Sequence, residues 1–488
     1  MTSENRKQHK GLHIKLGMHN RRAIILFSCV FPLLSASFWV AALDEDTKTL
    51  PAQKCKVALE EGLQYEDSIA APSAAPNPLP FPDIPIVEKG KRLPPIYREG
   101  DRVRAPRAYL PYDLSMQPLE GNPEDISAVG EALRKAEQGQ RIRMTFFGAS
   151  HTGGDYWTGH IRRVLQARYG DIGHGFTMPV PLYRSARAND INLCSTSGWV
   201  KDYVGYQDGH DDEYLAFGMS VSSDDPEEFA WLETTHQNPI GRNATFLDVY
   251  TLAQPDGGTL LAQIDQQQPF IIPTISDEYD LQQTKIETFE GPHRLTIRPA
   301  GDGEVRLFGI SVENPGPGIL VDSIGIRGRE ARTWLRWDED IFTQGIQSLA
   351  PDVVVLAYGT NEANFVDNTR ENYTKQLTNV LEKMRRALPD KACILVGPSD
   401  RGKKYKKGYA IWERTVMVAE VQREVAPNFG CVFWDWQQAQ GGEGSMIAWL
   451  YTDPPLAAKD LIHHTSAGYI HIAERFIEAL DDAKENYK

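Results

Sequence analysis

A serine follows a glycine at the end of a largely apolar run near residue 150. The run spans residues 142–147, Gly148 ends it, and Ser150 comes two positions later. Apolar residues then recur at helical spacing at 157, 161, 164 and 165. A strand that ends at a glycine, presents a serine and turns into a helix can display a nucleophile at the carboxyl edge of a sheet. The same pattern also fits an ordinary turn in which Ser150 caps the helix.

A carboxylate and an imidazole stand three residues apart near the other end of the chain, as Asp460 and His463. A helix is expected to begin just after them, near Ser466. One short turn can therefore supply both a general base and the group that orients its ring. His464 offers a second imidazole at the next position and competes for the role of the base. Acyl transfer by a Ser-His-Asp triad is the chemistry that these residue types support.

Two further loops follow apolar, strand-like runs. Gly325-Ile-Arg-Gly328 comes after residues 319–324, and Gly359-Thr-Asn-Glu362 comes after residues 353–358. Loops that carry Ser, Gly, Asn and Asp-x-x-His in that order resemble the four sequence blocks of the SGNH (GDSL-like) hydrolases. The resemblance covers roughly residues 140–170 and 319–482, with a long interruption between them. Within this family, the chain resembles the O-acetylesterases of polysaccharide and peptidoglycan that carry an inserted β domain.

The resemblance implies a role for each member of the triad. Ser150 is the expected nucleophile, His463 the base, and Asp460 the residue that holds the imidazole and stabilises its charged form. His463 is preferred to His464 because the family spacing places the base three residues after the Asp. We expect neither a cofactor nor a metal for this chemistry.

The resemblance also implies an oxyanion hole. The expected donors are the backbone N–H groups of Ser150 and Gly328 and the side-chain amide of Asn361. Gly325 is a rival of Gly328, although the second glycine fits the family block better. Glu362 keeps the acidic character of the usual third block, Gly-x-Asn-Asp.

The first block departs from the family at one position. It usually reads Gly-Asp-Ser, whereas Ala149 precedes the serine here. The missing carboxylate has no triad role, so its loss should alter the bracing of the loop more than the chemistry. Because of this departure, a non-catalytic relative of the family is an alternative.

Strand-like and helical patterns alternate in the two parts of the chain that carry the four blocks. One helix is expected at about 123–137. Another is expected up to residue 388, with Asn368 as its N-cap. The expected strands are residues 142–147, 319–324, 353–358, 392–396 and 431–434. This alternation predicts an α/β domain with a five-stranded parallel sheet covered on both faces. The family resemblance implies a flavodoxin-like three-layer α/β/α sandwich with Ser150 at the carboxyl edge.

The interruption, residues 183–316, has a different, β-rich pattern. Short strands are expected at 245–253, 258–264, 294–298 and 305–312, with hairpin-type turns at 255–258 and 300–303. We therefore predict an inserted all-β sandwich that resembles a carbohydrate-binding domain. A calcium-binding site in this insert is an alternative that the sequence leaves open. Because the helix after Ser150 returns to the amino edge of the sheet, the insert should leave from the edge opposite the active site. The insert covers the active site only if residues 171–181 return to the carboxyl edge of the sheet.

Composition excludes several classes of function. The 488 residues, of which 41% are hydrophobic and 24% charged, describe a globular protein. A formal net charge of −14 argues against nucleic acid as a partner. The five cysteines show no metal-binding spacing, and Cys393 and Cys431 are expected as small buried residues rather than as a disulfide. The run His210-Asp-Asp-Glu213 is expected to be a solvated acidic loop.

The N-terminus resembles a targeting signal. Residues 1–22 are basic, and residues 23–43 carry no charge over about 20 positions, enough to span a membrane. A signal anchor in the inner membrane and a cleaved signal peptide are both compatible with this pattern. Residues 44–108 form a Pro/Ala-rich tether, and the SGNH domain is expected in two parts, 109–182 and 317–488. The catalytic domain should then lie in the periplasm or outside the cell.

These expectations lead to one leading function and two alternatives. The leading one is an exported serine esterase that removes O-acetyl groups from a polysaccharide such as peptidoglycan. An O-acetyltransferase would use the same triad and pass the acyl group to a sugar hydroxyl instead of water. A non-catalytic carbohydrate-binding relative is the alternative from another class.

Overall fold

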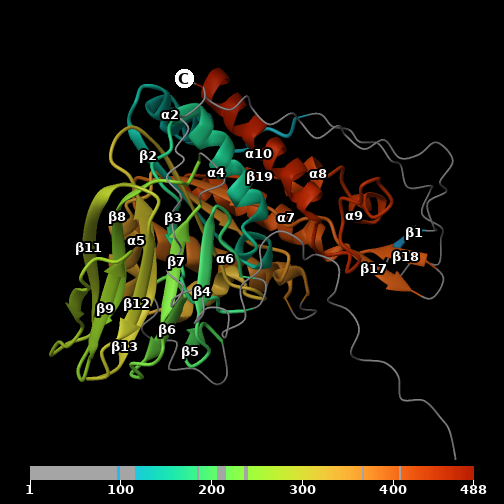
Figure 1. Cartoon of the computed structure of the whole chain (residues 1–488). Coiled ribbons are helices and arrows are strands. Elements are labelled where there is room, and N and C mark those ends of the chain that lie inside the picture. The colour runs from blue at the N-terminus through green and yellow to red at the C-terminus, as the bar shows by residue number, and fades with distance from the viewer. Residues whose placement is uncertain are drawn as a thin grey trace, which may run out of the picture. The chain divides into compact units, whose positions relative to one another are not determined.

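The computed structural model describes residues 96–98, 116–183, 186–205, 216–235, 240–364, 368–405 and 408–487 (Figure 1). The basic segment 1–22, the expected anchor 23–43 and the acidic run 210–213 lie outside the described residues. Within the described ranges, none of the helices combines the length and the apolar character that crossing a bilayer requires.

A five-stranded parallel sheet carries the four sequence blocks. In spatial order its strands are β14 (Gly318–Gly325), β2 (Arg141–Gly148), β15 (Val353–Ala357), β16 (Ala392–Val396) and β19 (Cys431–Trp434). All neighbours pair in parallel, so the carboxyl ends of the strands meet at one edge. The chain order second, first, third, fourth, fifth is flavodoxin-like. The predicted α/β fold with a five-stranded parallel sheet is confirmed.

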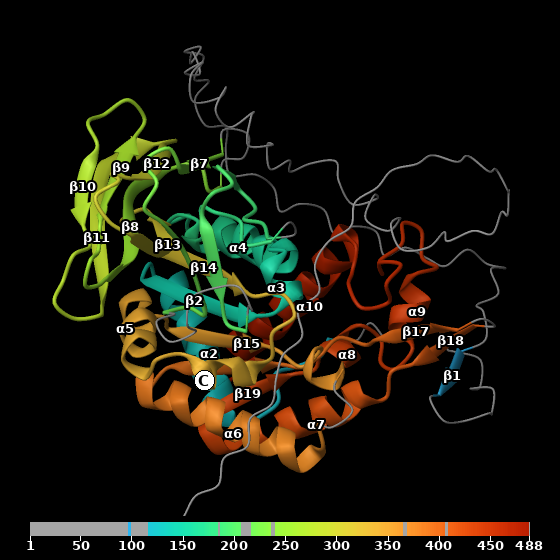
Figure 2. The ribbon, with the colours of Figure 1, turned by 90° about the horizontal axis from the view of Figure 1, so that it is seen from below.

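Helices cover both faces of this sheet through two large hydrophobic clusters. The first face carries α2 (Pro123–Glu137), α4 (Tyr156–Tyr169) and α10 (Ser466–Asn486), and the second carries α5 (Glu339–Leu349), α6 (Arg370–Ala387) and α7 (Arg414–Val425). Figure 2 shows α5, α6 and α7 in a row along the second face. The predicted cap of α6 is wrong by one residue. The Thr369 hydroxyl accepts the N–H of Asn372, whereas the Asn368 amide donates to the Glu362 carbonyl at 3.1 Å.

Short elements complete this domain. They are the helices α3 (Ser150–Gly153), α8 (Trp436–Ala439) and α9 (Ser445–Trp449), the 3-10 helices η2 (Ala331–Arg336), η3 (Glu362–Asn364) and η4 (Ala426–Phe429), and a small sheet of β1 (Ile96–Arg98), β17 (Gly402–Tyr405) and β18 (Gly408–Ile411). Most of them lie in the loops between the strands and helices of the parallel sheet.

The interruption folds as two antiparallel sheets (Figure 1). One contains β10 (Phe270–Pro273), β9 (Thr259–Ile264), β12 (Arg294–Pro299), β7 (Ala230–Thr234) and β4 (Ile191–Ser195). The other contains β11 (Asp280–Gly291), β8 (Ala244–Ala253), β13 (Val305–Glu313), β6 (Met219–Ser223) and β5 (Val200–Tyr203), with β3 (Gly175–Thr177) paired to β13. The predicted all-β character of this region is confirmed.

The two turns predicted as hairpins connect different sheets instead. β8 pairs with β11 and β13, whereas β9, which follows the turn at 255–258, pairs with β10 and β12. The turn at 300–303 likewise leads from β12 to β13 in the other sheet. The two turns pack together, because Gly258 donates its N–H to the Glu304 carbonyl at 2.8 Å. Glycine-rich turns of the same composition serve both kinds of connection, so the hairpin expectation was wrong.

Residues 171–183 return to the carboxyl edge of the parallel sheet before the chain enters the insert. Asp171 bridges to Ile319 near the start of β14, the Phe176 N–H donates to Asp322 in the middle, and the Tyr183 hydroxyl donates to the Gly325 carbonyl at the end. The segment therefore runs along the exposed edge of β14, in the same direction as the strand. The expectation that the insert stays at the opposite edge is wrong, because β14 is the terminal strand and leaves its edge open for this segment.

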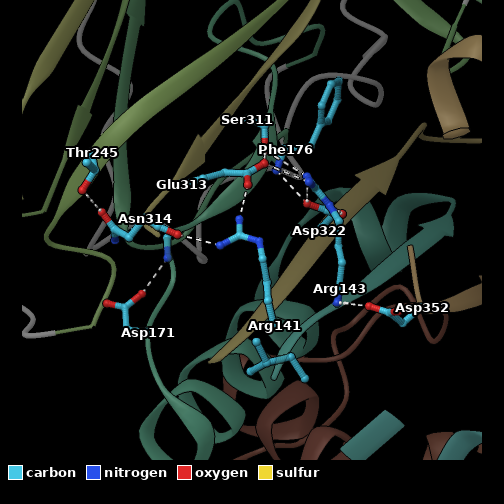
Figure 3. Close-up of polar contacts among 12 residues, drawn as sticks. Arg141, Arg143, Asp171, Phe176, Thr245, Ser311, Glu313, Asn314, Asp322 and Asp352 are labelled. Carbon is cyan, nitrogen blue, oxygen red and sulfur yellow. Dashed lines mark hydrogen bonds and ion pairs between the residues drawn. The ribbon is translucent and has the colours of Figure 1, made fainter. Parts of the chain in front are cut away.

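A buried ionic cluster joins the insert to the parallel sheet (Figure 3). Arg143 on β2 donates to both carboxylate oxygens of Asp322 on β14, at 2.7 and 2.9 Å, and to Glu313 on β13 at 2.8 Å. Arg141 also pairs with Glu313. The hydrophobic core of the insert is continuous with the core under α5, α6 and α7. The two β sheets and the α/β domain thus share one interior.

Removing the Asp322 carboxylate should destabilise this junction. Burial raises the pKa of Asp322, but the Arg143 charge and hydrogen bonds outweigh it and hold that pKa below the ordinary value. The carboxylate therefore contributes stability above its ordinary pKa, and that stability is lost as the pH falls through the lowered value. Asp322→Ala leaves Arg143 buried without its main partner, so the free energy of unfolding should fall by about 3–5 kcal/mol in a urea titration.

A matched control uses the pair of Arg168 and Asp481, whose side chains are 41% and 32% exposed. Asp481→Ala should cost about 1 kcal/mol or less, because solvent screens that pair. An Asp322→Ala variant as stable as the control variant would show that the buried cluster does not hold the junction together.

Cys393 and Cys431 form a disulfide, contrary to expectation. They face each other in the register of the parallel strands β16 and β19, with Cα atoms 4.5 Å apart. Sequence alone placed both at strand starts, but only the strand register brings their sulfur atoms together.

Candidate active site

Ser150 stands at the carboxyl end of β2, as the first residue of α3. Gly148 is required before it, because a Cβ at that position would lie 2.2 Å from the Thr152 hydroxyl. As the first helical residue, Ser150 has a backbone N–H with no acceptor inside the helix. The loop thus presents both a hydroxyl and an N–H at the edge where the other three blocks end.

The structure brings Ser150, His463 and Asp460 into one hydrogen-bonded chain. Ser150 Oγ lies 2.8 Å from His463 Nε2, and His463 Nδ1 lies 2.7 Å from Asp460 Oδ2. Asp460 Oδ1 accepts the backbone N–H groups of Ile462 and His463 at 3.0 and 2.9 Å. The turn therefore fixes the carboxylate and the imidazole relative to each other before α10 begins.

The charge state of Asp460 suits this arrangement. Partial burial raises the pKa of the carboxyl, but the hydrogen bonds and charge of His463 outweigh it and lower the pKa below its ordinary value. An ionised Asp460 favours the tautomer with its proton on His463 Nδ1, which leaves Nε2 free to accept the Ser150 proton.

His464 does not reach Ser150. Its side chain is buried beside Trp449, with ring centroids 5.3 Å apart, and burial lowers its pKa to about 3. The geometry therefore places His463, and not its neighbour, in the position of a general base.

The loop after β14 offers the second backbone donor. Arg329 donates its N–H to the Ile326 carbonyl at 3.2 Å, which closes a turn with Gly328 at its third position. Gly328 has φ +74°, as that position of a type II turn requires, and no atom lies within 4 Å of the place where a Cβ would stand. The turn does not use the Gly328 N–H, so this donor remains for a ligand.

Gly325 has a packing role instead. Its carbonyl accepts the Tyr183 hydroxyl at 2.6 Å, and a Cβ there would lie 2.1 Å from the Gly153 nitrogen. The glycine allows β14 and α3 to approach closely. Between the two glycines of this block, only Gly328 lies in an open turn.

Asn361 connects the second and third blocks. Its side-chain Nδ2 donates to the Arg329 carbonyl at 2.8 Å, which uses one of its two N–H groups and leaves the other. Glu362 accepts the Ala331 and Gly359 N–H groups, each at 2.8 Å, so its carboxylate joins the same two loops. Burial raises the pKa of Glu362 to about 7. The sequence indicated an acidic residue here but not this bracing role.

His151 is a residue that sequence reasoning missed. Its ring centroid lies 5.2 Å from that of His463, and its Nδ1 lies 2.8 Å from the Tyr469 hydroxyl. Burial lowers the pKa of His151 well below its ordinary value, and the nearby His463 and His464 lower that pKa further. A neutral ring therefore packs against His463. Its position after Ser150 carried no sequence signal for this contact.

The loop that lacks the usual aspartate is braced by backbone contacts. Gly153 donates its N–H to the Ala149 carbonyl at 2.8 Å, and Ile326 donates to the Gly148 carbonyl at 3.0 Å. The Ala149 side chain is 5% exposed and belongs to the hydrophobic core. A carboxylate in that place would need partners that an apolar core does not supply. No group of metal-ligating side chains is present among the described residues.

Asn361→Ala should lower kcat for an acetyl ester by roughly 10²–10³, with little change in KM, because it removes one donor to the developing oxyanion. Initial rates on para-nitrophenyl acetate measure both constants. Asn364→Ala, on the exposed side of η3, is the matched control. A rise in KM with unchanged kcat would instead assign Asn361 to substrate binding.

Comparison with known proteins identifies a family for part of the chain. Residues 304–470 match the model of the GDSL-like lipase/acylhydrolase family. The chain carries a GDSL-like acylhydrolase domain. The match begins one residue before β13, so the block with Ser150 precedes the matched residues and most of the insert lies between the two. The predicted resemblance to SGNH hydrolases, and with it an SGNH-type ester hydrolase, is confirmed.

One of the matching solved structures shares the fold of this chain. A peptidoglycan O-acetylesterase has a TM-score of 0.62 and 24% identity, over 74% of this chain and 97% of that one. A family two carbohydrate esterase from Clostridium thermocellum, an active-site mutant, has a TM-score of 0.26 and 13% identity, over 60% of this chain and 99% of that one. No curated protein sequence matches the chain.

Proposed function

We propose that the chain is an exported serine esterase that removes O-acetyl groups from a cell-surface polysaccharide, with peptidoglycan as the first candidate. The observation that carries the proposal is the hydrogen-bonded chain from Ser150 through His463 to Asp460. It lies at the carboxyl edge of the sheet, where the loops with Gly328 and Asn361 also follow their strands. These are a nucleophile, a base and donors for an oxyanion.

The first half of the reaction forms an acetyl-enzyme. Ser150 Oγ attacks the acetyl carbonyl while His463 Nε2 takes the hydroxyl proton, and Asp460 stabilises the imidazolium. The carbonyl oxygen becomes an oxyanion, which the N–H groups of Ser150, Gly328 and Asn361 stabilise. Collapse of the tetrahedral intermediate breaks the bond to the sugar oxygen, and this oxygen takes the proton from His463.

The second half releases acetate. His463 Nε2 removes a proton from water, whose oxygen attacks the acetyl carbonyl of acetyl-Ser150. The second tetrahedral intermediate collapses, the Ser150 oxygen takes the proton back, and acetate leaves. No redox step or cofactor is required for this sequence.

Three observations support the sugar substrate and the exported location. The match to the solved peptidoglycan O-acetylesterase covers 74% of this chain and 97% of that one. The disulfide between Cys393 and Cys431 is typical of proteins in oxidising compartments. Residues 23–43 have the length and lack of charge of a membrane anchor or an export signal. We propose the periplasm or the cell exterior as the place of action.

Acetate release from O-acetylated peptidoglycan and acetylated xylan tests this function. We expect acetate from at least one polymer with wild-type protein, and only background release with Ser150→Ala. Addition of a deacetylated glycan acceptor should leave acetate release unchanged. Acetyl transfer to the acceptor in place of acetate release would identify an acetyltransferase, and no acetyl turnover on any polymer or on para-nitrophenyl acetate would contradict the esterase function.

A further inference from the structure

Arginine residues lie on segments that contact the candidate active site of an acidic chain. The chain contains 66 acidic and 52 basic residues, yet three segments that meet at Ser150 carry arginine. They are the turn with Arg327 and Arg329, the segment with Arg401, and the start of the insert with Arg187. The arginines therefore come from three separate segments of the sequence.

Arg327 and Arg329 flank Gly328, the expected backbone donor. Their turn is tied to the Ser150 loop, because the Ile326 N–H donates to the Gly148 carbonyl at 3.0 Å, and to Asn361 through the Arg329 carbonyl at 2.8 Å. Arg327 is exposed, and Arg329 is half-buried with its guanidinium 5.3 Å from the Tyr203 ring centroid. Two arginines therefore flank the proposed oxyanion donor in the same turn.

Arg401 lies on the side of the histidine turn. Gly402 donates its N–H to the Leu461 carbonyl at 3.0 Å, which attaches this segment between Asp460 and His463. The Arg401 guanidinium lies over Trp412, 4.9 Å from the ring centroid. Arg187 approaches from the insert, where its N–H donates to the Gly153 carbonyl at 3.2 Å, three residues after Ser150.

The first three arginines lack carboxylate partners in the part of the chain that the structure describes. Arg327, Arg329 and Arg401 form no ion pair there, and Arg329 Nε is buried without an acceptor. Burial lowers the pKa of Arg401, and the field of Asp460 offsets this only in part. Elsewhere, arginines such as Arg143 and Arg162 are paired with carboxylates. Arg327, Arg329 and Arg401 differ from these in having no ion pair within the described residues.

We propose that the acetylated glycan bears carboxylates near its acetyl groups, and that Arg327, Arg329 and Arg401 bind them. This inference rests on the proposed esterase function and names the class of its substrate. A guanidinium matches a carboxylate by charge and by its fork of N–H donors. Two arginines on one turn and a third on a separate segment suit carboxylates repeated along a sugar chain, whereas one phosphate group would need convergent donors. The substrate is thus an acidic rather than a neutral polysaccharide.

A pair of polymers that differ only in charge tests this. A polyuronate is acetylated directly, and a second batch is acetylated after its carboxyl groups have been reduced to hydroxymethyl groups. We expect wild-type kcat/KM, expressed per acetyl group, to be roughly tenfold higher for the acidic polymer, as a few partly exposed ion pairs allow. This preference should shrink as salt is added, because salt screens the charges.

Variants then locate the effect. In the triple variant Arg327→Gln, Arg329→Gln, Arg401→Gln, the ratio of kcat/KM for the acidic and reduced polymers should fall to about one. Arg386→Gln removes a 57% exposed arginine on α6, outside the catalytic loops, and is the matched control. Its ratio should equal that of the wild type.

The outcomes separate this inference from the esterase function. If wild-type protein hydrolyses both polymers with equal kcat/KM, or prefers the reduced one, the carboxylate inference is wrong while the esterase stands. If the triple variant keeps the wild-type ratio, other residues recognise the charge and the assignment to these arginines is wrong. If neither polymer nor para-nitrophenyl acetate releases acetate, both the esterase function and the inference fail.

Discussion

Ser150→Ala should lower kcat/KM for para-nitrophenyl acetate by roughly 10⁴- to 10⁶-fold, because loss of the nucleophile removes the covalent route. The remaining rate would come from the oxyanion donors and His463 acting on water. Ser150 caps no helix with its side chain, and its hydroxyl contacts His463, so the fold should be preserved. Circular dichroism and the urea midpoint check this.

Ser348→Ala is the matched control for that experiment. The Ser348 hydroxyl donates to the Gly345 carbonyl within α5, away from the four catalytic loops. The control variant should keep wild-type activity. A Ser150→Ala protein within tenfold of the wild type would mean that the hydrogen-bonded chain in the structure is not the catalytic apparatus.

Asp460→Asn should have the second largest effect, a loss of roughly 10³–10⁴ in kcat. An amide cannot satisfy both sets of contacts that the carboxylate makes. If its oxygen accepts the backbone N–H groups of Ile462 and His463, its NH2 group faces His463 Nδ1. That nitrogen must then accept, the ring proton moves to Nε2, and the Ser150 hydroxyl loses its base.

Steady-state rates on para-nitrophenyl acetate measure the effect, with Asp481→Asn as the control. Asp481 pairs with Arg168 outside the catalytic loops, and its amide variant should retain full activity. A loss below tenfold in Asp460→Asn would show that the carboxylate does not set the tautomer of His463.

The strands and the four loops could be predicted because their signals are local. Residues 392–396 and 431–434 were predicted with the same bounds as β16 and β19, since each is a short apolar run between turn residues. The order of residue types at the strand ends placed Ser150, Gly328, Asn361 and the histidine turn at one edge of the sheet. That edge is where a parallel sheet must bring them together.

The contacts between distant segments could not be predicted in the same way. Arg143, Glu313 and Asp322 are separated by long stretches of sequence, and nothing in their local pattern distinguishes a buried ionic cluster from solvated charges. The bond from Tyr183 to Gly325 depends on the insert running along the open edge of β14. Turns rich in glycine also gave no indication of which sheet each following strand would join.

The acetyl-enzyme tests the central claim most directly. Wild-type protein is mixed with para-nitrophenyl acetate, quenched in acid within the first turnover, and digested for mass analysis. We predict a stoichiometric burst of nitrophenol and one acetyl group on the peptide that contains Ser150, absent from the Ser150→Ala variant. An acetyl group on another residue, or equal labelling of the Ser150→Ala variant, would contradict the account.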